Sequence, residues 1–89
     1  MLHSENFKET TITINGEKCR MEYDVAPAIE NSFRGFGNIY MAGKNEPLEF
    51  TFFTLNDQIS GYTPMNIKKE IMADIVDATT GQRLPFENL

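Results

Sequence analysis

The dipeptide Asn15-Gly16, set between two strand-like segments, constrains this chain more than any other feature. Both central residues of a type I′ turn need a positive φ, which asparagine and glycine adopt at little steric cost. Before the turn lies the run Thr10–Ile14, whose β-branched side chains suit a pleated strand. After it, apolar and charged residues alternate as far as Val25. The sequence therefore predicts an N-terminal β-hairpin over residues 7-25.

The alternation within this hairpin also predicts which side chains face the core. Ile12 and Ile14 lie two residues apart, so they project on the same side of the first arm. The second arm has its charged residues on one face and its apolar residues on the other. Because a buried thiol behaves as a small apolar group, we interpret Cys19 as a core residue and not as a nucleophile. The full apolar set of that arm is Cys19, Met21, Tyr23 and Val25.

The stretch after the hairpin predicts a short helix. Pro27 suits a first helical turn, because its missing N–H would have no intrahelical partner there. Ile29 and Phe33 lie four residues apart, which places both side chains on one helical face. Gly35 then provides a residue that can end the helix. We therefore expect a helix across residues 26-34.

Two further strands are expected in the middle of the chain. One lies near residues 37-42 and precedes a run of turn-forming residues. The other covers residues 48-55 and carries Phe52 on one face and Phe53 on the other. A strand that is apolar on both faces is typical of a central strand or of one covered by a partner. A polar loop is expected to follow, up to the start of the next element.

The C-terminal third predicts a helix near residues 64-78. Thr63-Pro64 resembles an N-cap followed by proline at the first helical position, and Gly81 is suited to end the helix. At about 100° per residue, the apolar residues of this segment form one stripe along the helix. The stripe consists of Ile67, Ile71, Ile75 and Ala78, widened by Met65, Met72 and Val76.

A second fold stays open for the same segment. Lys68 falls inside the apolar arc of the helix, and residues 71-77 also fit a strand. In this all-β alternative, residues 79-81 form the turn of a C-terminal hairpin. We favour the helix, which predicts an α+β fold with a small antiparallel sheet of about four strands packed against it.

The length and the ends of the chain fit one small domain, residues 1-89. A chain of 89 residues encloses a single core and leaves no room for a second. Residues 1-6 are polar, and we expect them to be flexible. They lack the basic start and apolar stretch of a secretory signal, and no window of the sequence approaches a membrane span. Residues 82-89 either dock through Leu84 and Phe86 or fray.

Charge and cysteine content narrow the partners. Asp and Glu total 13 against 8 Lys and Arg, giving a net charge of -5 and a pI near 4.7. This charge argues against binding to nucleic acid or to a membrane, and favours another protein with a basic patch. The lone cysteine allows no intramolecular disulfide, and no cysteine–histidine cluster suggests zinc. The composition is typical of a cytoplasmic protein without metal or cofactor.

The run Arg34-Gly35-Phe36-Gly37 resembles the start of the strand on which RNA-recognition motifs stack bases. Asn38 stands where that motif has an aromatic residue, and the preceding hairpin differs from its strand-helix-strand order. The acidic charge also opposes RNA binding. We interpret the run as a glycine turn that connects a helix to a strand.

No set of residues predicts an active site. His3 is the only histidine and lies in the polar N-terminal segment, where nothing holds it within reach of a substrate. Glu70, Asp74 and Asp77 fall on the polar face of the expected helix. They match no calcium-loop spacing, so we interpret them as a solvated face. The sequence therefore does not predict an enzyme.

The sequence favours a noncatalytic protein-interaction module, such as a small regulator or inhibitor that binds a basic surface of a larger protein. The alternative is a self-assembling subunit of a homo-oligomer, such as a homodimer, which buries a sheet edge or the second face of residues 48-55. A small-ligand-binding domain or an RNA binder ranks below both. The expected contacts combine the helix carboxylates with aromatic residues on loops and on the second strand face. They are Glu70, Asp74, Asp77, Phe36, Tyr62 and Phe53.

Overall fold

A computed structural model describes residues 1–87 of the chain. Within these residues the protein forms one antiparallel sheet of five strands in sequence order, followed by one helix. The architecture agrees with the predicted α+β class, but the sheet has five strands where about four were expected. The elements are β1 (Lys8–Ile14), β2 (Glu17–Pro27), β3 (Ser32–Tyr40), β4 (Leu48–Leu55), β5 (Gln58–Thr63) and α1 (Lys69–Thr80).

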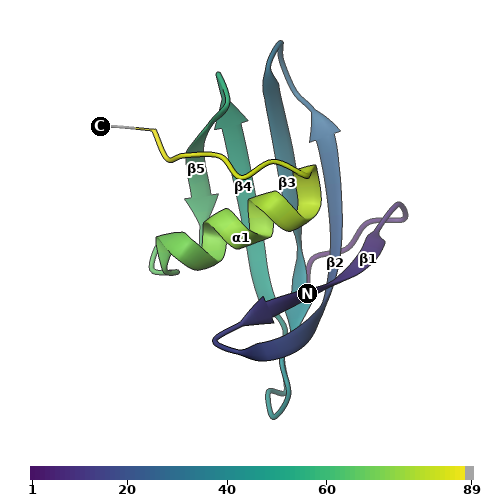
Figure 1. Ribbon diagram of the computed structural model, residues 1–89. Coiled ribbons are helices and arrows are strands. Elements are labelled where there is room, and N and C mark those ends of the chain that lie inside the picture. The colour runs from purple at the N-terminus through teal and green to yellow at the C-terminus, as the bar shows by residue number, and fades with distance from the viewer. Residues whose placement is uncertain (88–89) are drawn as a thin grey trace.

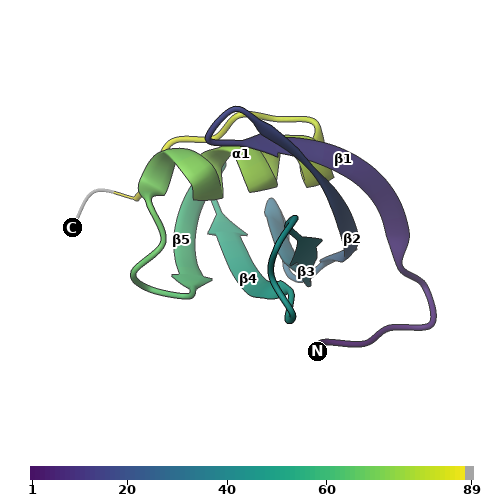
Figure 2. The same ribbon diagram turned by 90° about the horizontal axis from the view of Figure 1, so that it is seen from below.

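The helix crosses one face of the sheet (Figure 1). Figure 2 shows that the sheet is curved, so that the hairpin of β1 and β2 curls toward α1. The N-terminal segment lies on the opposite side of the sheet from the helix (Figure 2). The core therefore fills the space between the concave face of the sheet and α1. Its buried members are Ile12, Ile14, Cys19, Met21, Ile39, Phe50, Phe52, Ile59, Met72, Ile75 and Val76.

The N-terminal β-hairpin is confirmed, and so is its turn. Asn15 and Gly16 have φ values of 52° and 81°, as a turn with two left-handed residues requires. Ile14 pairs with Glu17 directly beside the turn, and the ladder continues to the start of β1. Ile12 and Ile14 are buried, as the alternation predicts.

Two glycines allow β3 to pack closely against the neighbouring strands β2 and β4. A Cβ atom added at Gly35 would overlap the ring of Phe52, and one added at Gly37 would overlap the backbone oxygen of Glu22. Both residues lie inside the strand, opposite phenylalanines of β4. The expectation of a glycine turn at this point is therefore wrong. Glycine is needed here because other parts of the protein approach the β3 backbone too closely for a side chain.

The helix expected across residues 26-34 is also wrong. β2 continues to Pro27, and a tight turn then leads into β3 at Ser32. Asn31 has a φ of 59° in this turn, and the Ser32 N–H donates to the Ile29 carbonyl at 2.9 Å. The physical reason is that β3 pairs with β2 on one side and β4 on the other, which satisfies its backbone groups along the strand. The strand expected near residues 37-42 is β3, which begins earlier, at Ser32, and ends earlier, at Tyr40.

Strand β5 replaces the polar loop expected after β4. Asn56 and Asp57 have φ values of 53° and 60°, so they form a turn of the same kind as Asn15-Gly16. β5 pairs with β4, which makes β4 a strand with neighbours on both sides. β4 is therefore not an edge strand, which agrees with one of the two expectations for residues 48-55.

The C-terminal segment is helical, so the all-β alternative is wrong. α1 begins later than the range 64-78, because Lys68 is extended, with φ -65° and ψ 137°. Gly81 ends the helix as expected, with a φ of 81° and its N–H donating to the Asp77 carbonyl at 2.8 Å. No helix in the described part of the chain is long and apolar enough to cross a membrane.

The buried face of α1 differs in part from the predicted stripe. Met65 lies before the helix and is 85% exposed, and Ala78 is exposed on its far side. Lys68 no longer conflicts with the apolar arc, because it precedes the helix. The residues of α1 that are buried are Met72, Ala73, Ile75 and Val76.

The segment after α1 docks on the free edge of β5. The Ile59 N–H donates to the Pro85 carbonyl at 2.8 Å, and the Glu87 N–H donates to the Ile59 carbonyl at 2.9 Å. Leu84 and Phe86 pack against the core. Of the two expectations for residues 82-89, docking through these side chains is therefore confirmed and fraying is not, as far as residue 87. Residues 88–89 lie outside the described part of the chain.

The glycine positions give a direct test of this packing. We predict that Gly37→Ala lowers the free energy of unfolding by ~1–3 kcal/mol, the usual cost of overpacking. Gly61→Ala is the matched control, because its added Cβ meets nothing within 4 Å. Urea unfolding followed by circular dichroism measures both variants. Equal stability of the two would contradict the close packing of β3.

Candidate functional site

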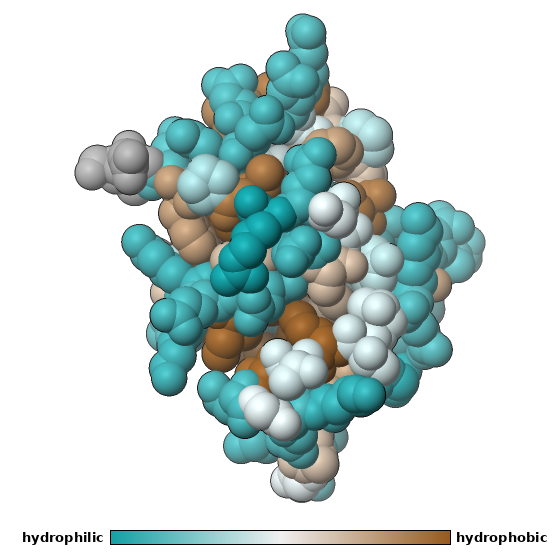
Figure 3. Space-filling view, viewed as in Figure 1, coloured by the Kyte–Doolittle hydropathy of each residue, from teal (hydrophilic) through white to brown (hydrophobic). Residues whose placement is uncertain are grey.

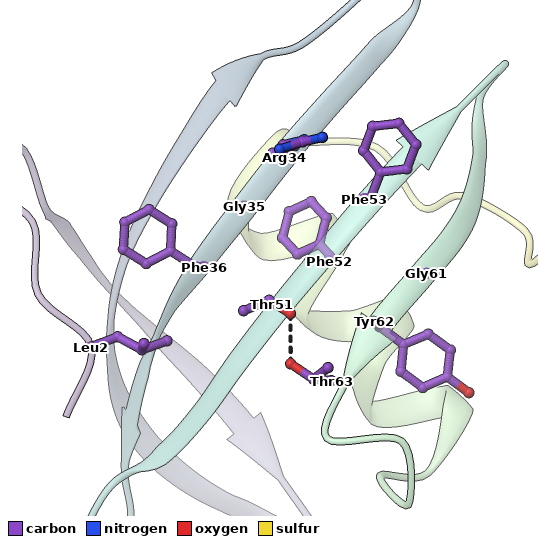
Figure 4. Close-up of a pocket in the computed structure, with 10 residues that line it drawn as sticks. All are labelled: Leu2, Arg34, Gly35, Phe36, Thr51, Phe52, Phe53, Gly61, Tyr62 and Thr63. Atoms are coloured by element: carbon purple, nitrogen blue, oxygen red, sulfur yellow. Dashed lines mark hydrogen bonds between the residues drawn. The ribbon is translucent and has the colours of Figure 1, made fainter.

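The face of the sheet turned away from α1 carries an apolar groove across β3, β4 and β5. Its volume is about 370 Å³. Figure 4 shows it with α1 behind the sheet, the rings of Phe36 and Phe53 on either side and the Phe52 ring between them in this view. We call it the outer-face groove. It is lined chiefly by Leu2, Arg34, Phe36, Thr51, Phe53 and Gly61.

The strand register explains why this face is hollow. Across the three strands, Phe36 pairs with Thr51, and Phe53 pairs with Gly61. Each large ring therefore has a small residue as its neighbour on the same face. The hydroxyls of Thr51 and Thr63 share a hydrogen bond of 2.5 Å, which uses the proton of one of the two. The groove is the space that these small residues leave between the two rings.

Arg34 places a positive charge at one end of the groove. It pairs with Phe53 across β3 and β4, and its guanidinium carbon lies 5.5 Å from the centre of the Phe53 ring. This distance is typical of a cation–π contact, which holds the planar guanidinium over the ring. Within residues 1–87, no carboxylate lies within 4.0 Å of Arg34. The charge is thus held in place without an acidic partner in that range.

The N-terminal segment forms one wall of the groove. The Asn38 side chain donates to the Leu2 carbonyl at 2.8 Å, and its oxygen accepts from the Leu2 N–H at 3.1 Å. Ser4 donates to Asp24 at 2.8 Å. These bonds hold Leu2 beside the rings, while the flexibility expected for residues 1-6 stays a prediction.

A partly buried hydrogen-bond network connects the N-terminal segment to β2 and β3. Asn38 is fully buried in β3, and its amide also donates to Glu22 at 2.8 Å. The Tyr40 hydroxyl donates to the same Glu22 oxygen at 2.6 Å. The Tyr40 hydrogen bond is the main reason that the pKa of Glu22 lies below its ordinary value; Asn38 and Arg20 act in the same direction, whereas burial opposes them. The network keeps one carboxylate charged in a partly buried place.

The acidic residues predicted on the helix lie far from the groove, on the other side of the sheet. Figure 3, which looks onto α1, shows mostly hydrophilic side chains over the helix. An Arg83 nitrogen lies 2.5 Å from a carboxylate oxygen of Asp74. Asp74 raises the pKa of Arg83, and Asp77 and Glu70 add to this effect. Arg83 therefore offsets part of the negative charge on which the sequence hypothesis depended.

Two of the three predicted aromatic contacts, Phe36 and Phe53, have their rings on the groove face, and Tyr62 does not. Phe36 belongs to β3 and Tyr62 to β5, so neither is in a loop as expected. Phe53 and Phe36 provide two of the walls of the groove. Tyr62 pairs with the core residue Phe52, so its side chain lies on the core side of β5, where its ring packs edge-on against Phe86 with centres 5.6 Å apart.

Neither of the candidate catalytic groups, Cys19 and His3, lines the groove. Cys19 is buried in the core, and burial raises the pKa of its thiol. His3 is exposed in the N-terminal segment. Among residues 1–87, no group of three or more His, Cys, Asp or Glu side chains is placed to hold a metal ion. What the described residues do assemble is an apolar groove with two aromatic rings and one cation.

Comparison with protein-family models, curated protein sequences and solved structures finds no match to this chain. The groove is therefore interpreted from its own geometry. Sequence reasoning missed Arg34, Gly61 and Leu2 as parts of this surface. The signals for it in the sequence were Phe36 and the apolar second face of β4, which carries Phe53.

The Glu22 network predicts a specific loss of stability in acid. Because the folded-state pKa of Glu22 lies below its ordinary value of 4.5, its contribution is fully present above that value. The contribution is lost as the pH falls through the folded-state pKa. We expect Glu22→Gln to flatten the decline in unfolding free energy between neutral and acidic pH. Glu30→Gln, in an exposed loop, is the control, and a decline unchanged by Glu22→Gln would contradict the network.

The bonds between Asn38 and Leu2 predict that Asn38 holds the N-terminal wall in place. Asn38→Ala removes both bonds, so we expect faster hydrogen exchange at the Leu2 amide and faster proteolysis before residue 7. NMR exchange rates measure the first effect directly. Asn45→Ala, in an exposed loop, should leave these rates unchanged. Equal exchange rates in the Asn38 variant and the wild type would show that Asn38 does not hold the segment.

Proposed function

We propose that this chain is a noncatalytic protein-interaction module, a small regulator or inhibitor that binds a larger protein through the outer-face groove. The observation that carries the proposal is the gap between Phe36 and Phe53 on the face of the sheet away from α1. Rigid aromatic rings beside a pocket are typical anchors of protein interfaces, because they bury a large area at low entropic cost. Strands hold these rings more firmly than loops would.

The charge of the chain supports a partner with a basic surface. A net charge of -5 attracts such a surface over several ångströms and speeds association. In this proposal the carboxylates of Glu70, Asp74 and Asp77 steer the partner and do not anchor it. The single buried cysteine is consistent with a reducing, cytoplasmic setting for both proteins.

Self-assembly is the second candidate function. Phe53 and Leu55 lie on the outer side of β4 and are only partly buried, so a second copy could cover them. Among the described residues, β1 pairs only with β2, which leaves the other edge of this strand for a further strand. Mutual repulsion between two chains of charge -5 weighs against this candidate.

Filling the groove tests the proposal. Gly61→Val places a side chain in the open space beside Phe53 and suits a strand. We expect the wild-type protein to capture a partner from the native lysate that Gly61→Val does not retain. Binding to the purified partner, measured by biolayer interferometry, should weaken as the salt concentration rises.

Thr13→Val is the matched control, because it adds valine at an exposed strand position away from the groove. It should bind like the wild type. Full binding by Gly61→Val, or loss of binding only on charge reversal at Asp74 and Asp77, would contradict the groove as the contact surface. Light scattering that shows a stable homodimer, broken by Gly61→Val, would instead favour self-assembly.

A further inference from the structure

We propose that the outer-face groove receives one segment of a partner protein with two features. An apolar side chain fills the gap between Phe36 and Phe53, and a neighbouring Asp or Glu side chain pairs with Arg34. This inference rests on the proposed function and adds the chemistry of the segment that is bound. It follows from the charge, the walls and the floor of the groove.

The carboxylate follows from the state of Arg34. The chain has three arginines, and Arg20 and Arg83 each lie within hydrogen-bond distance of a carboxylate. Arg34 has no carboxylate within 4.0 Å among residues 1–87, although acidic residues outnumber basic ones 13 to 8. A guanidinium presents its N–H donors in a rigid fork that matches a carboxylate. The contact with the Phe53 ring already restricts the Arg34 side chain, so that pairing with a carboxylate costs less conformational entropy.

The apolar side chain follows from the lining of the groove. Phe36, Phe53 and Leu2 provide its walls, and the Thr51 hydroxyl is hydrogen-bonded to that of Thr63. A volume of about 370 Å³ lies within the range of roughly 300–1,000 Å³ found for ligand pockets. The groove is open along the sheet, whereas small-molecule sites enclose most of their ligand. An extended segment that lays one or two side chains into it fits this shape.

Charge distinguishes a partner segment from the other possible occupants. Aromatic rings beside a cation on a sheet also suit stacked bases, but every nucleotide adds a phosphate that the net charge of -5 repels. A second copy of this chain would bring the same negative charge. On an otherwise basic protein surface, a single carboxylate pairs with Arg34 locally, while the surrounding basic residues are attracted by the net negative charge of the chain.

Amidated and acetylated hexapeptides test this inference, because their only carboxylate is on a side chain. The probe set places Leu or Phe beside Asp, Asn or Lys at each neighbouring position, and fluorescence polarisation measures binding to the full chain. We expect the wild type to prefer one Asp position over Asn roughly ten-fold. Arg34→Gln should remove this preference, and Arg34→Glu should transfer it to Lys.

Lys44→Gln is the control for net charge, because it removes one positive charge from an exposed loop. It should keep the preference for Asp. Equal binding of Asp and Asn peptides, no binding of any peptide, or tighter binding of a single-stranded oligouridine would overturn the inference. If any of these results came with a partner that the wild type binds and Gly61→Val does not, the proposed function would stand and only the segment chemistry would fail.

Discussion

The close approach of β3 to its neighbours is the constraint on which the rest of the structure depends. Gly35 leaves room for the Phe52 ring, and Gly37 leaves room for the backbone of β2. The rings of Phe50 and Phe52 can then lie parallel beneath α1, with centres 6.4 Å apart, in the core of the concave face. Because side chains alternate along a strand, turning these two rings toward the helix turns Phe53 outward. One packing arrangement thus determines both the core and the outer-face groove, and a shift of one residue in the register of β4 would exchange them.

Those parts of the fold that depend on neighbouring residues could be predicted from the sequence. The turn at Asn15-Gly16, the core side of its hairpin and the helix end at Gly81 are local signals, and the structure contains all three. In the sequence the glycines of β3 resemble a turn, because the contacts that require glycine there come from residues distant along the chain. Two apolar residues four apart are weak evidence for a helix when the same segment can pair on both sides within a sheet. The turn at residues 56-57 carries the same kind of signal as the first hairpin, without the glycine that makes such a turn easy to recognise.

The candidate site shows the same division. Phe36 and Phe53 could be named from residue type alone, since exposed aromatic residues are common interface anchors. Arg34 and Gly61 could not, because their roles follow from the cross-strand pairs that place them beside Phe53. The carboxylates of α1 were correctly expected on the polar side, but Arg83, which follows the helix in sequence, folds back onto Asp74. Tertiary contacts therefore shift the weight of the proposal from the charged helix to the opposite face of the sheet.

The central claim is that this opposite face is where another protein binds. NMR chemical shifts of the ¹⁵N-labelled chain, recorded with and without the captured partner, test it most directly. The account predicts that the largest changes fall on the amides of Phe36, Phe53 and Gly61 and on the side-chain Nε of Arg34. Changes concentrated along α1, with the groove signals unmoved, would contradict it.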